Sequence, residues 1–119
     1  RDFTFIDDII EGVVRVLDQS AKADDDWSSD NPNPSTSQAP WRVYNIGSNN
    51  PVELKRYVAS LERSLGKKAE IELLPIQPGD VPNTFADVDN LMQDFDYKPE
   101  TPIEKGVEKF ADWFNNYYK

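Results

Sequence analysis

The segment Leu73-Leu74-Pro75-Ile76-Gln77-Pro78-Gly79-Asp80-Val81-Pro82-Asn83-Thr84-Phe85-Ala86-Asp87 differs in character from the rest of the chain. Its prolines fix backbone angles and remove hydrogen-bond donors, which predicts neither helix nor central strand. Gly79, between Pro78 and Asp80, marks a turn that allows close backbone approach. A loop stiffened in this way, carrying an acid and an amide, can form the edge of a ligand site. It can equally be a stiff connection between a strand and a helix, and residue chemistry alone slightly favours that simpler interpretation.

Composition limits the possible functions. The chain has 119 residues, enough for one domain with one core, and its 22 acidic and 13 basic residues give a net charge of −9. Nucleic-acid binding needs clustered Lys and Arg and is therefore disfavoured. The absence of cysteine excludes disulfides and thiolate metal sites, and the absence of histidine removes the commonest general base. No apolar run reaches membrane-spanning length and no signal peptide is visible, so we expect a cytoplasmic protein. The start at Arg1 rather than Met leads us to expect a fragment of something longer.

Residue patterns predict an α/β order. Alternation and β-branched or aromatic residues predict strands at 1–6, 41–47 and 69–74. Apolar residues at helical spacing predict four helices. The first is capped by Asp7 and Asp8 and ends near Asp18, and the second starts at Asn50-Pro51-Val52-Glu53 and stops at Gly66. The third covers 90–95 after a cap at Asp89, and the last starts at Thr101-Pro102-Ile103-Glu104. The order β-α-loop-β-α-β-loop-α-α has too few strands for a complete doubly wound sheet, so we expect a small mixed α/β unit.

Two further segments have simple interpretations. Residues 19–40 form a long polar loop that we expect to be mobile, and only Trp27 could anchor it to a core. Its acidic run, Asp24-Asp25-Asp26, has no EF-hand spacing and is predicted to be a solvated surface rather than a metal site. The aromatic stripe of the last helix is predicted to be core rather than a ligand site; it comprises Phe110, Trp113, Phe114 and Tyr117.

Catalytic chemistry is scarce. There is no glycine-rich phosphate-binding motif, and no nucleophile–base pair can be assembled without His or Cys. The acid pairs Asp7/Asp8 and Asp87/Asp89 stand at predicted helix starts, where capping is favoured over catalysis. Arg1 could bind a phosphate bidentately or be a surface charge. Asp80 could accept hydrogen bonds from the vicinal hydroxyls of a ribose or merely close its own turn.

Four segments become more informative when they are taken together. They are Arg1-Asp2-Phe3-Thr4-Phe5-Ile6-Asp7-Asp8-Ile9, Val43-Tyr44-Asn45-Ile46-Gly47, Pro78-Gly79-Asp80 and Tyr97-Lys98-Pro99-Glu100-Thr101. Their order resembles that in extended short-chain dehydrogenases/reductases, specifically the NAD-dependent nucleotide-sugar epimerases and dehydratases. The resemblance covers essentially the whole chain. The long Asp/Asn/Pro/Ser loop and the run Gln77-Pro78-Gly79-Asp80-Val81-Pro82 are most similar to the UDP-glucuronate 4-epimerase subgroup.

This resemblance implies that residues 1–119 are a C-terminal UDP-sugar-binding domain without the Rossmann core. In the family, an N-terminal Rossmann domain binds NAD and carries the Tyr-x-x-x-Lys pair that performs the chemistry. The expected ligand is UDP-glucuronate or UDP-galacturonate, with NAD bound mainly by the absent domain. The fragment alone is expected to bind no cofactor or metal and to be inactive.

The resemblance also implies which residues contact the substrate. Arg1 matches an arginine that meets the diphosphate, and Asp80 matches an acid near the uridine ribose. Phe3 stands beside the nucleotide where some relatives have Tyr, so a hydroxyl contact is lost. Gln77 stands where many relatives have a phosphate-binding Arg, which removes a second cationic clamp but agrees with the glucuronate subgroup.

Other interpretations stay open at this point. The chain could be the same domain of a 4,6-dehydratase or of another sugar epimerase, or a non-enzymatic acidic module that binds proteins. In the family, the first helix and the strand at 43–46 pack near the Rossmann sheet. The parent is expected to be a homodimer, and the fragment is expected to expose apolar surface and to self-associate.

Overall fold

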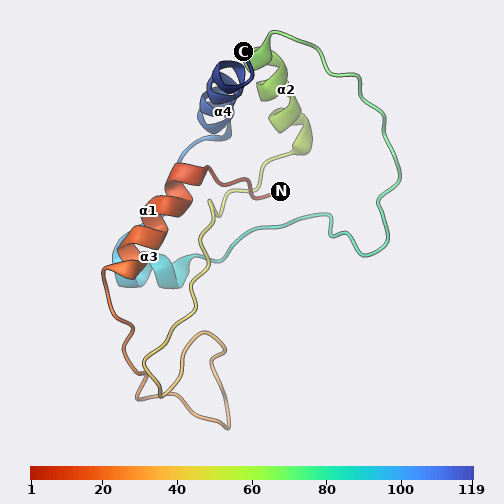
Figure 1. The fold of residues 1–119 in the computed structure, drawn as a ribbon. Helices are drawn as coiled ribbons and strands as arrows, with labels where there is room; N and C mark the ends of the chain where they lie inside the picture. The colour runs from red at the N-terminus through yellow and green to blue at the C-terminus, as the bar shows by residue number, and fades with distance from the viewer.

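Four α-helices and no β-strand make up the computed structural model, which describes residues 1–119 (Figure 1). Their bounds are Ile6–Leu17 for α1, Leu54–Leu65 for α2, Asp89–Phe95 for α3 and Ile103–Tyr117 for α4. All four predicted helices are therefore present. α2 ends as predicted at Gly66, whose φ of 64° is left-handed. Helix prediction succeeds because apolar spacing and stop residues are local properties of the chain.

The three predicted strands are wrong for this chain, and the mixed α/β class is corrected to helices joined by irregular segments. A strand is stable only when its backbone groups pair with a neighbouring strand. The segments at 1–6, 41–47 and 69–74 do not form a ladder with one another. The nearest approach to pairing is at Arg1, which exchanges two backbone hydrogen bonds of 2.8 Å with Val52. The alternating pattern therefore marks segments that suit a sheet but have no partner strand within residues 1–119.

Two of the residues predicted to cap helices, Asp8 and Thr101, contact each other instead. No helix has a side-chain hydrogen bond at its N-cap. Asp8 lies inside α1, and its carboxylate accepts hydrogen bonds from the Thr101 backbone N–H at 2.9 Å and hydroxyl at 2.7 Å. Asp8 and Thr101, each expected to cap its own helix, thus join the start of α1 to the segment before α4. Asp89 is itself the first residue of α3, and its N–H donates to Asp87 Oδ1 at 3.1 Å.

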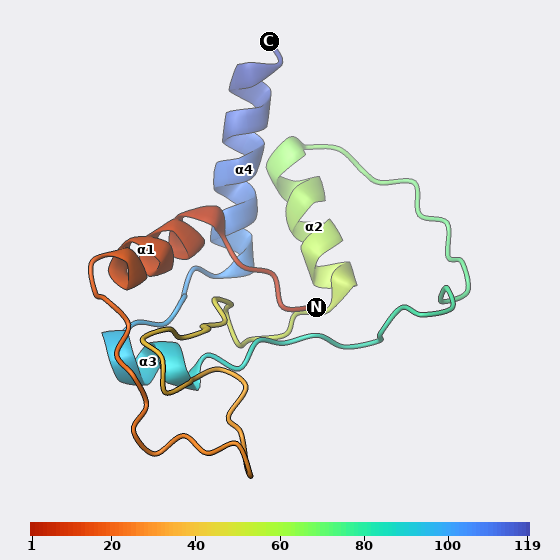
Figure 2. The ribbon, with the colours of Figure 1, turned by 60° about the horizontal axis from the view of Figure 1, so that its bottom comes forward.

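The helices associate as two pairs. α2 packs along α4, and α1 lies against α3 (Figures 1 and 2). The Tyr97 hydroxyl donates to the Asp8 carbonyl at 2.7 Å, and the Arg15 guanidinium lies 4.7 Å from the centre of the Tyr97 ring. The largest fully buried side chains lie in or near α3 and are Val88, Leu91 and Pro99. The first and third helices are thus joined through the segment that leads into α4.

The chain lacks the single core that its length predicts. Its accessible surface is 9294 Å², whereas a compact protein of this mass exposes about 6,600 Å². Its radius of gyration is 18.5 Å, against roughly 13.5 Å for a compact domain of this length. Only 11 of 119 residues are buried. The architecture is an open frame of helices and long loops.

Much of the exposed surface is apolar. α1 exposes its apolar face, as predicted, with Leu17 80% and Ile6 60% exposed. The aromatic stripe of α4 was predicted to be core, and that prediction is wrong here because Trp113 is 52% and Tyr117 67% exposed. Their rings stack on each other with centroids 5.3 Å apart. Helical spacing shows that a face is apolar, but it does not show whether residues 1–119 contain anything to cover that face.

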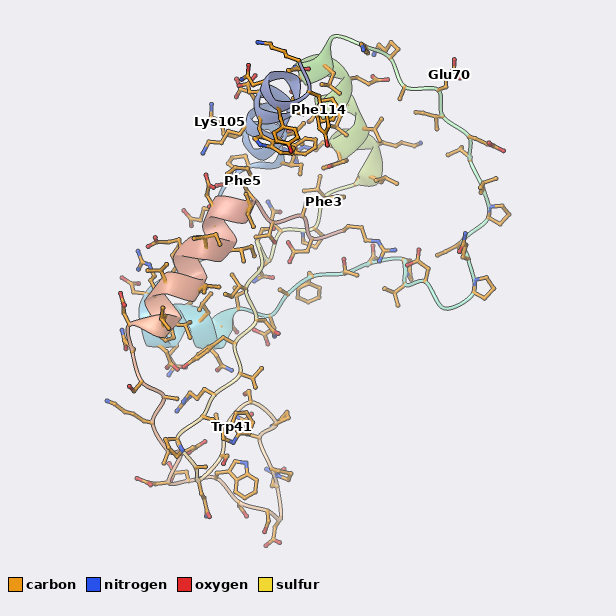
Figure 3. All side chains as sticks on the ribbon, viewed as in Figure 1. Phe3, Phe5, Trp41, Glu70, Lys105 and Phe114 are labelled. Atoms are coloured by element: carbon orange, nitrogen blue, oxygen red, sulfur yellow. The ribbon has the colours of Figure 1, made fainter.

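Two long loops leave the helical frame. Residues 67–88 swing widely outward between α2 and α3, with Glu70 far from the helices (Figure 3). In the loop at 19–40, Trp27 contacts the loop itself rather than a core, and its indole N–H donates to the Asn33 carbonyl at 3.2 Å. The backbone N–H of Asp24 donates to the Ser37 carbonyl at 2.9 Å. The mobility of this loop stays a prediction, which amide hydrogen exchange would measure.

Candidate functional site

The proline-rich loop contains the turn that its sequence predicts. The Asp80 N–H donates to the Gln77 carbonyl at 3.1 Å, and Gly79 has a φ of 89°. Proline at the second position and a left-handed glycine at the third are the signature of a type II turn. A side chain at Gly79 would strain this backbone. The turn therefore holds Gln77 and Asp80 in a defined relation on an otherwise exposed loop.

Arg1 and Asp80 meet although they are far apart in the sequence. The Arg1 guanidinium donates to Asp80 Oδ1, and the two side chains are 34% and 50% exposed. This hydrogen bond lowers the pKa of Asp80 below its usual 3.8. The paired backbone hydrogen bonds to Val52 fix the backbone of Arg1. One cation and one anion, both accessible to solvent, thus converge at the turn.

Phe3 and Gln77 lie differently from this ion pair. The Phe3 ring stacks on Tyr57 of α2, with centroids 4.5 Å apart and an interplanar angle of 12°. Phe3 also lines a polar hollow of about 440 Å³ between residues 48–52 and 98–103. Phe3 and Phe5 lie where α1, α2 and α4 converge (Figure 3). Gln77 is exposed and joins the site through its carbonyl in the turn. The structure thus brings Arg1 to Asp80, places Gln77 in the same turn as Asp80, and turns Phe3 toward α2.

Asp2 organises this region, although no sequence motif singled it out. Its Oδ2 accepts hydrogen bonds from the Ala86 N–H at 2.8 Å and the Asn49 N–H at 3.1 Å, and its Oδ1 accepts one from the Ser48 hydroxyl. The Asp2 N–H donates to Thr84 Oγ1 at 3.3 Å. One residue therefore joins two remote segments, 48–49 and 84–86, to the start of the chain. The only sequence signal was a second charged residue beside Arg1, which is too common to be informative.

Gly47 permits this assembly. A Cβ atom at Gly47 would lie 2.5 Å from Ala86 Cβ and 3.2 Å from Asp2 Oδ2. Real Cβ atoms do not approach a carbon that closely, so only glycine fits. The glycine that closes the predicted strand at 41–47 is thus required by close packing rather than by a strand end.

The comparisons with known proteins cover the whole chain. Protein CapI from Staphylococcus aureus is 50% identical over 119 residues, which are 100% of this chain and 36% of CapI. UDP-glucuronate 4-epimerase 6 from Arabidopsis thaliana is 43% identical over 99% of this chain and 25% of its own length. The probable UDP-glucuronate 4-epimerase from Rhizobium meliloti is 38% identical over 100% of this chain and 35% of its own length. No family model matches the chain.

Solved structures agree with these relatives. A mutant of UDP-glucuronic acid 4-epimerase from Bacillus cereus, in complex with UDP-4-deoxy-4-fluoro-glucuronic acid and NAD, aligns with a TM-score of 0.72 and 29% identity. That alignment covers 99% of this chain and 32% of the epimerase. This chain is a portion of an NAD-dependent epimerase/dehydratase family protein. UDP-glucose 4-epimerase from Bifidobacterium longum shares the fold at a TM-score of 0.73 and 20% identity over 30% of its length.

The chain spans about a third of the length of its relatives. The share is 36% for CapI and 35% for the Rhizobium meliloti protein. The absence of a sheet in a chain that aligns well with epimerase structures is consistent with this partial coverage. Within residues 1–119 the predicted strands have no partner strand, and the apolar faces of α1 and α4 stay exposed.

A second polar cluster of the epimerase-family chain is unsuited to proton transfer. The Tyr44 hydroxyl donates to Asp94 Oδ2 at 2.6 Å, and Arg42 lies 3.5 Å from the same oxygen. Burial, followed by the hydrogen bond to Asp94, raises the pKa of Tyr44 to about 12. A general base needs a pKa near the operating pH. Tyr44 is therefore a structural contact between the 41–47 segment and α3.

Residues 1–119 lack two further features. They contain no cluster of three or more acidic side chains that could hold a metal ion. No helix is long and apolar enough to cross a membrane.

The carboxylate of Asp2 makes stability depend on pH. Burial alone would raise its pKa above 3.8, but hydrogen bonds from Ser48 and from backbone N–H groups outweigh burial and lower the pKa. A lowered pKa contributes stability that is fully present above the unfolded-state pKa of about 3.9 and is lost as pH falls through the folded-state value. We expect the difference in unfolding free energy between wild type and Asp2→Asn to be constant from about pH 5 to 8 and to shrink below about pH 4. Urea unfolding at several pH values would measure it, and a difference undiminished near pH 2.5 would contradict it.

Proposed function

We propose that this chain is the C-terminal UDP-sugar-binding portion of an NAD-dependent nucleotide-sugar epimerase that interconverts UDP-glucuronate and UDP-galacturonate. The observation that carries the proposal is the meeting of Arg1 and Asp80 at the Gln77–Asp80 turn. The identity of 43% to an Arabidopsis thaliana UDP-glucuronate 4-epimerase supports the sugar class.

The ion pair suggests how a nucleotide is received. A diphosphate offers Arg1 a stronger, bidentate partner than a single carboxylate oxygen. When Arg1 turns to the diphosphate, the Asp80 oxygens become available to accept hydrogen bonds from the two ribose hydroxyls. Both side chains are accessible enough to exchange partners in this way. Gln77 contributes a neutral amide to the same turn, and Phe3 contributes ring surface without a hydroxyl.

Residues 1–119 do not fit NAD by themselves. A dinucleotide site needs a glycine-rich turn between a strand and a helix, and this chain has neither the motif nor a strand. The redox step and its catalytic residues are therefore assigned to sequence outside this chain, and residues 1–119 bind and orient the sugar nucleotide. The exposed aromatic face of α4 favours one competing function, a module that binds other proteins.

The test uses the full-length protein that contains this chain. It is expected to interconvert UDP-glucuronate and UDP-galacturonate, whereas residues 1–119 alone give no turnover. Arg1→Gln is expected to raise KM by roughly 10- to 150-fold, because a hydrogen bond to a charged group contributes about 1.5–3 kcal/mol.

Arg42→Gln is the matched control, because Arg42 also pairs with an aspartate, Asp94, but away from the turn. Its KM is expected to stay near that of wild type. A 4,6-dehydrated product would assign the chain to a dehydratase instead. A full-length protein that binds no UDP-sugar would favour the protein-binding module.

A further inference from the structure

Arg1 and Asp80 can pair only if the segment that carries Asp80 is attached close to Arg1. Arg1 and Asp80 are separated by 79 positions, and Asp80 lies on the exposed loop 67–88 that swings away from the helices (Figures 1 and 2). Apolar packing does not hold that loop, since Leu73 is 83% and Leu74 72% exposed. The loop returns to the frame at Thr84 and Ala86, and both of these residues are bound by Asp2.

Asp2 attaches this loop from the position next to Arg1. Successive side chains of extended backbone point to opposite faces, so Arg1 reaches the turn while Asp2 points back into the frame. Asp2 Oδ2 binds the N–H of Ala86 on the loop and the N–H of Asn49 on the segment before α2. The half-buried carboxylate accepts both as charge-assisted hydrogen bonds, a class that is shorter and stronger than neutral hydrogen bonds.

We propose that Asp2 is a positioning residue for the sugar-nucleotide site: it fixes the spacing between Arg1 and the Gln77–Asp80 turn without touching the ligand. The inference rests on the proposed function, because it assigns the site its support. Gly47 is independent evidence for the same junction, since its missing Cβ is what allows Ala86 to reach Asp2. Asparagine keeps one acceptor oxygen for the two N–H groups, but it loses the negative charge that strengthens these hydrogen bonds, and its NH₂ group would have to donate to the Ser48 hydroxyl.

Asp2→Asn in the full-length protein is the main test, and Asp8→Asn is its matched control. Asp8 is also half-buried and also accepts two hydrogen bonds from a distant segment, at Thr101, but it touches neither Arg1 nor the 67–88 loop. We expect Asp2→Asn to raise KM for UDP-glucuronate at least about tenfold with kcat within about twofold, the pattern of lost uniform binding. Asp8→Asn is expected to lower the thermal midpoint comparably and to leave KM unchanged.

A double mutant identifies the route of the effect. If Asp2 acts by placing the turn, Asp80→Asn raises KM in the wild-type background but adds little in the Asp2→Asn background. Should Asp2→Asn fail to fold, Ser48→Ala removes a single donor to the same carboxylate and is expected to raise KM in the same direction by a smaller factor.

The outcomes separate the two proposals. A wild-type protein without epimerase turnover or UDP-sugar binding overturns the proposed function. Normal wild-type turnover, with Asp2→Asn behaving like Asp8→Asn, overturns only the positioning role. Fully additive effects of Asp2→Asn and Asp80→Asn also overturn it, because they would show that Asp2 does not act through the turn.

Discussion

Gly47→Ala is expected to destabilise the protein by about 1–3 kcal/mol, the usual cost of forcing an extra methyl group into a packed site. The new Cβ would lie 2.5 Å from Ala86 Cβ, so one of the two backbones must move. Movement of Ala86 also breaks its hydrogen bond to Asp2 and releases the loop that carries Asp80. Nucleotide affinity should therefore fall together with stability. Urea unfolding and UDP titration of the full-length protein would measure the two effects.

A compensating substitution tests the cause. Ala86→Gly removes the atom with which the new Cβ collides, so Gly47→Ala combined with Ala86→Gly is expected to recover most of the lost stability and affinity. Such recovery is a direct coupling between neighbouring sites. Equal stability of Gly47→Ala and wild type, or no recovery in the double mutant, would show that the junction tolerates a side chain.

The second large effect is expected for residues 1–119 as an isolated chain, which we predict to self-associate. Leu17 is 80% exposed at the end of α1, and Tyr117 is 67% exposed at the end of α4. Exposed apolar helix faces of this kind normally lie in an interface. Sedimentation velocity over a range of concentrations should show dimers or larger species, and weaker association at lower concentration.

Charge substitutions assign this association to a face. Ile10→Glu with Leu17→Glu places carboxylates on the apolar face of α1, whereas Trp113→Glu does so on α4. The variant that restores a monomer, the α1 double substitution or Trp113→Glu, identifies the face used. A wild-type chain that stays monomeric at high concentration would contradict the prediction, and it would imply that both faces tolerate water in the absence of the rest of the parent protein.

The helices could be predicted because each depends on residues close together in sequence. Apolar spacing predicted α1 and α4, and Gly66 predicted the end of α2. The strands could not be predicted correctly, since a strand needs a partner and alternation does not say whether the partner lies in the same chain. The prediction of N-terminal helix caps failed for a related reason. Asp8 and Thr101 suit a local cap, but in the fold they bind each other.

The candidate site divides in the same way. Residue order and resemblance to a family predicted Arg1, Phe3, Gln77 and Asp80 as site residues, and the prolines with Gly79 predicted the turn. Phe3 could not be seen to stack on Tyr57, since nothing in the sequence relates their positions. Asp2 was missed because its importance lies in its partners, which come from two segments far along the chain.

Local spacing and turn chemistry were thus enough to establish four helices, a stiff loop and the absence of a nucleotide-phosphate motif. The folded chain alone decided that the stiff loop is attached at Asp2, that its turn faces Arg1, and that the apolar faces of α1 and α4 remain uncovered. The physical reason is the distance along the sequence over which each interaction acts. Backbone angles and helical periodicity are properties of neighbouring residues, whereas hydrogen bonds between distant segments and the burial of a face depend on how the whole chain closes.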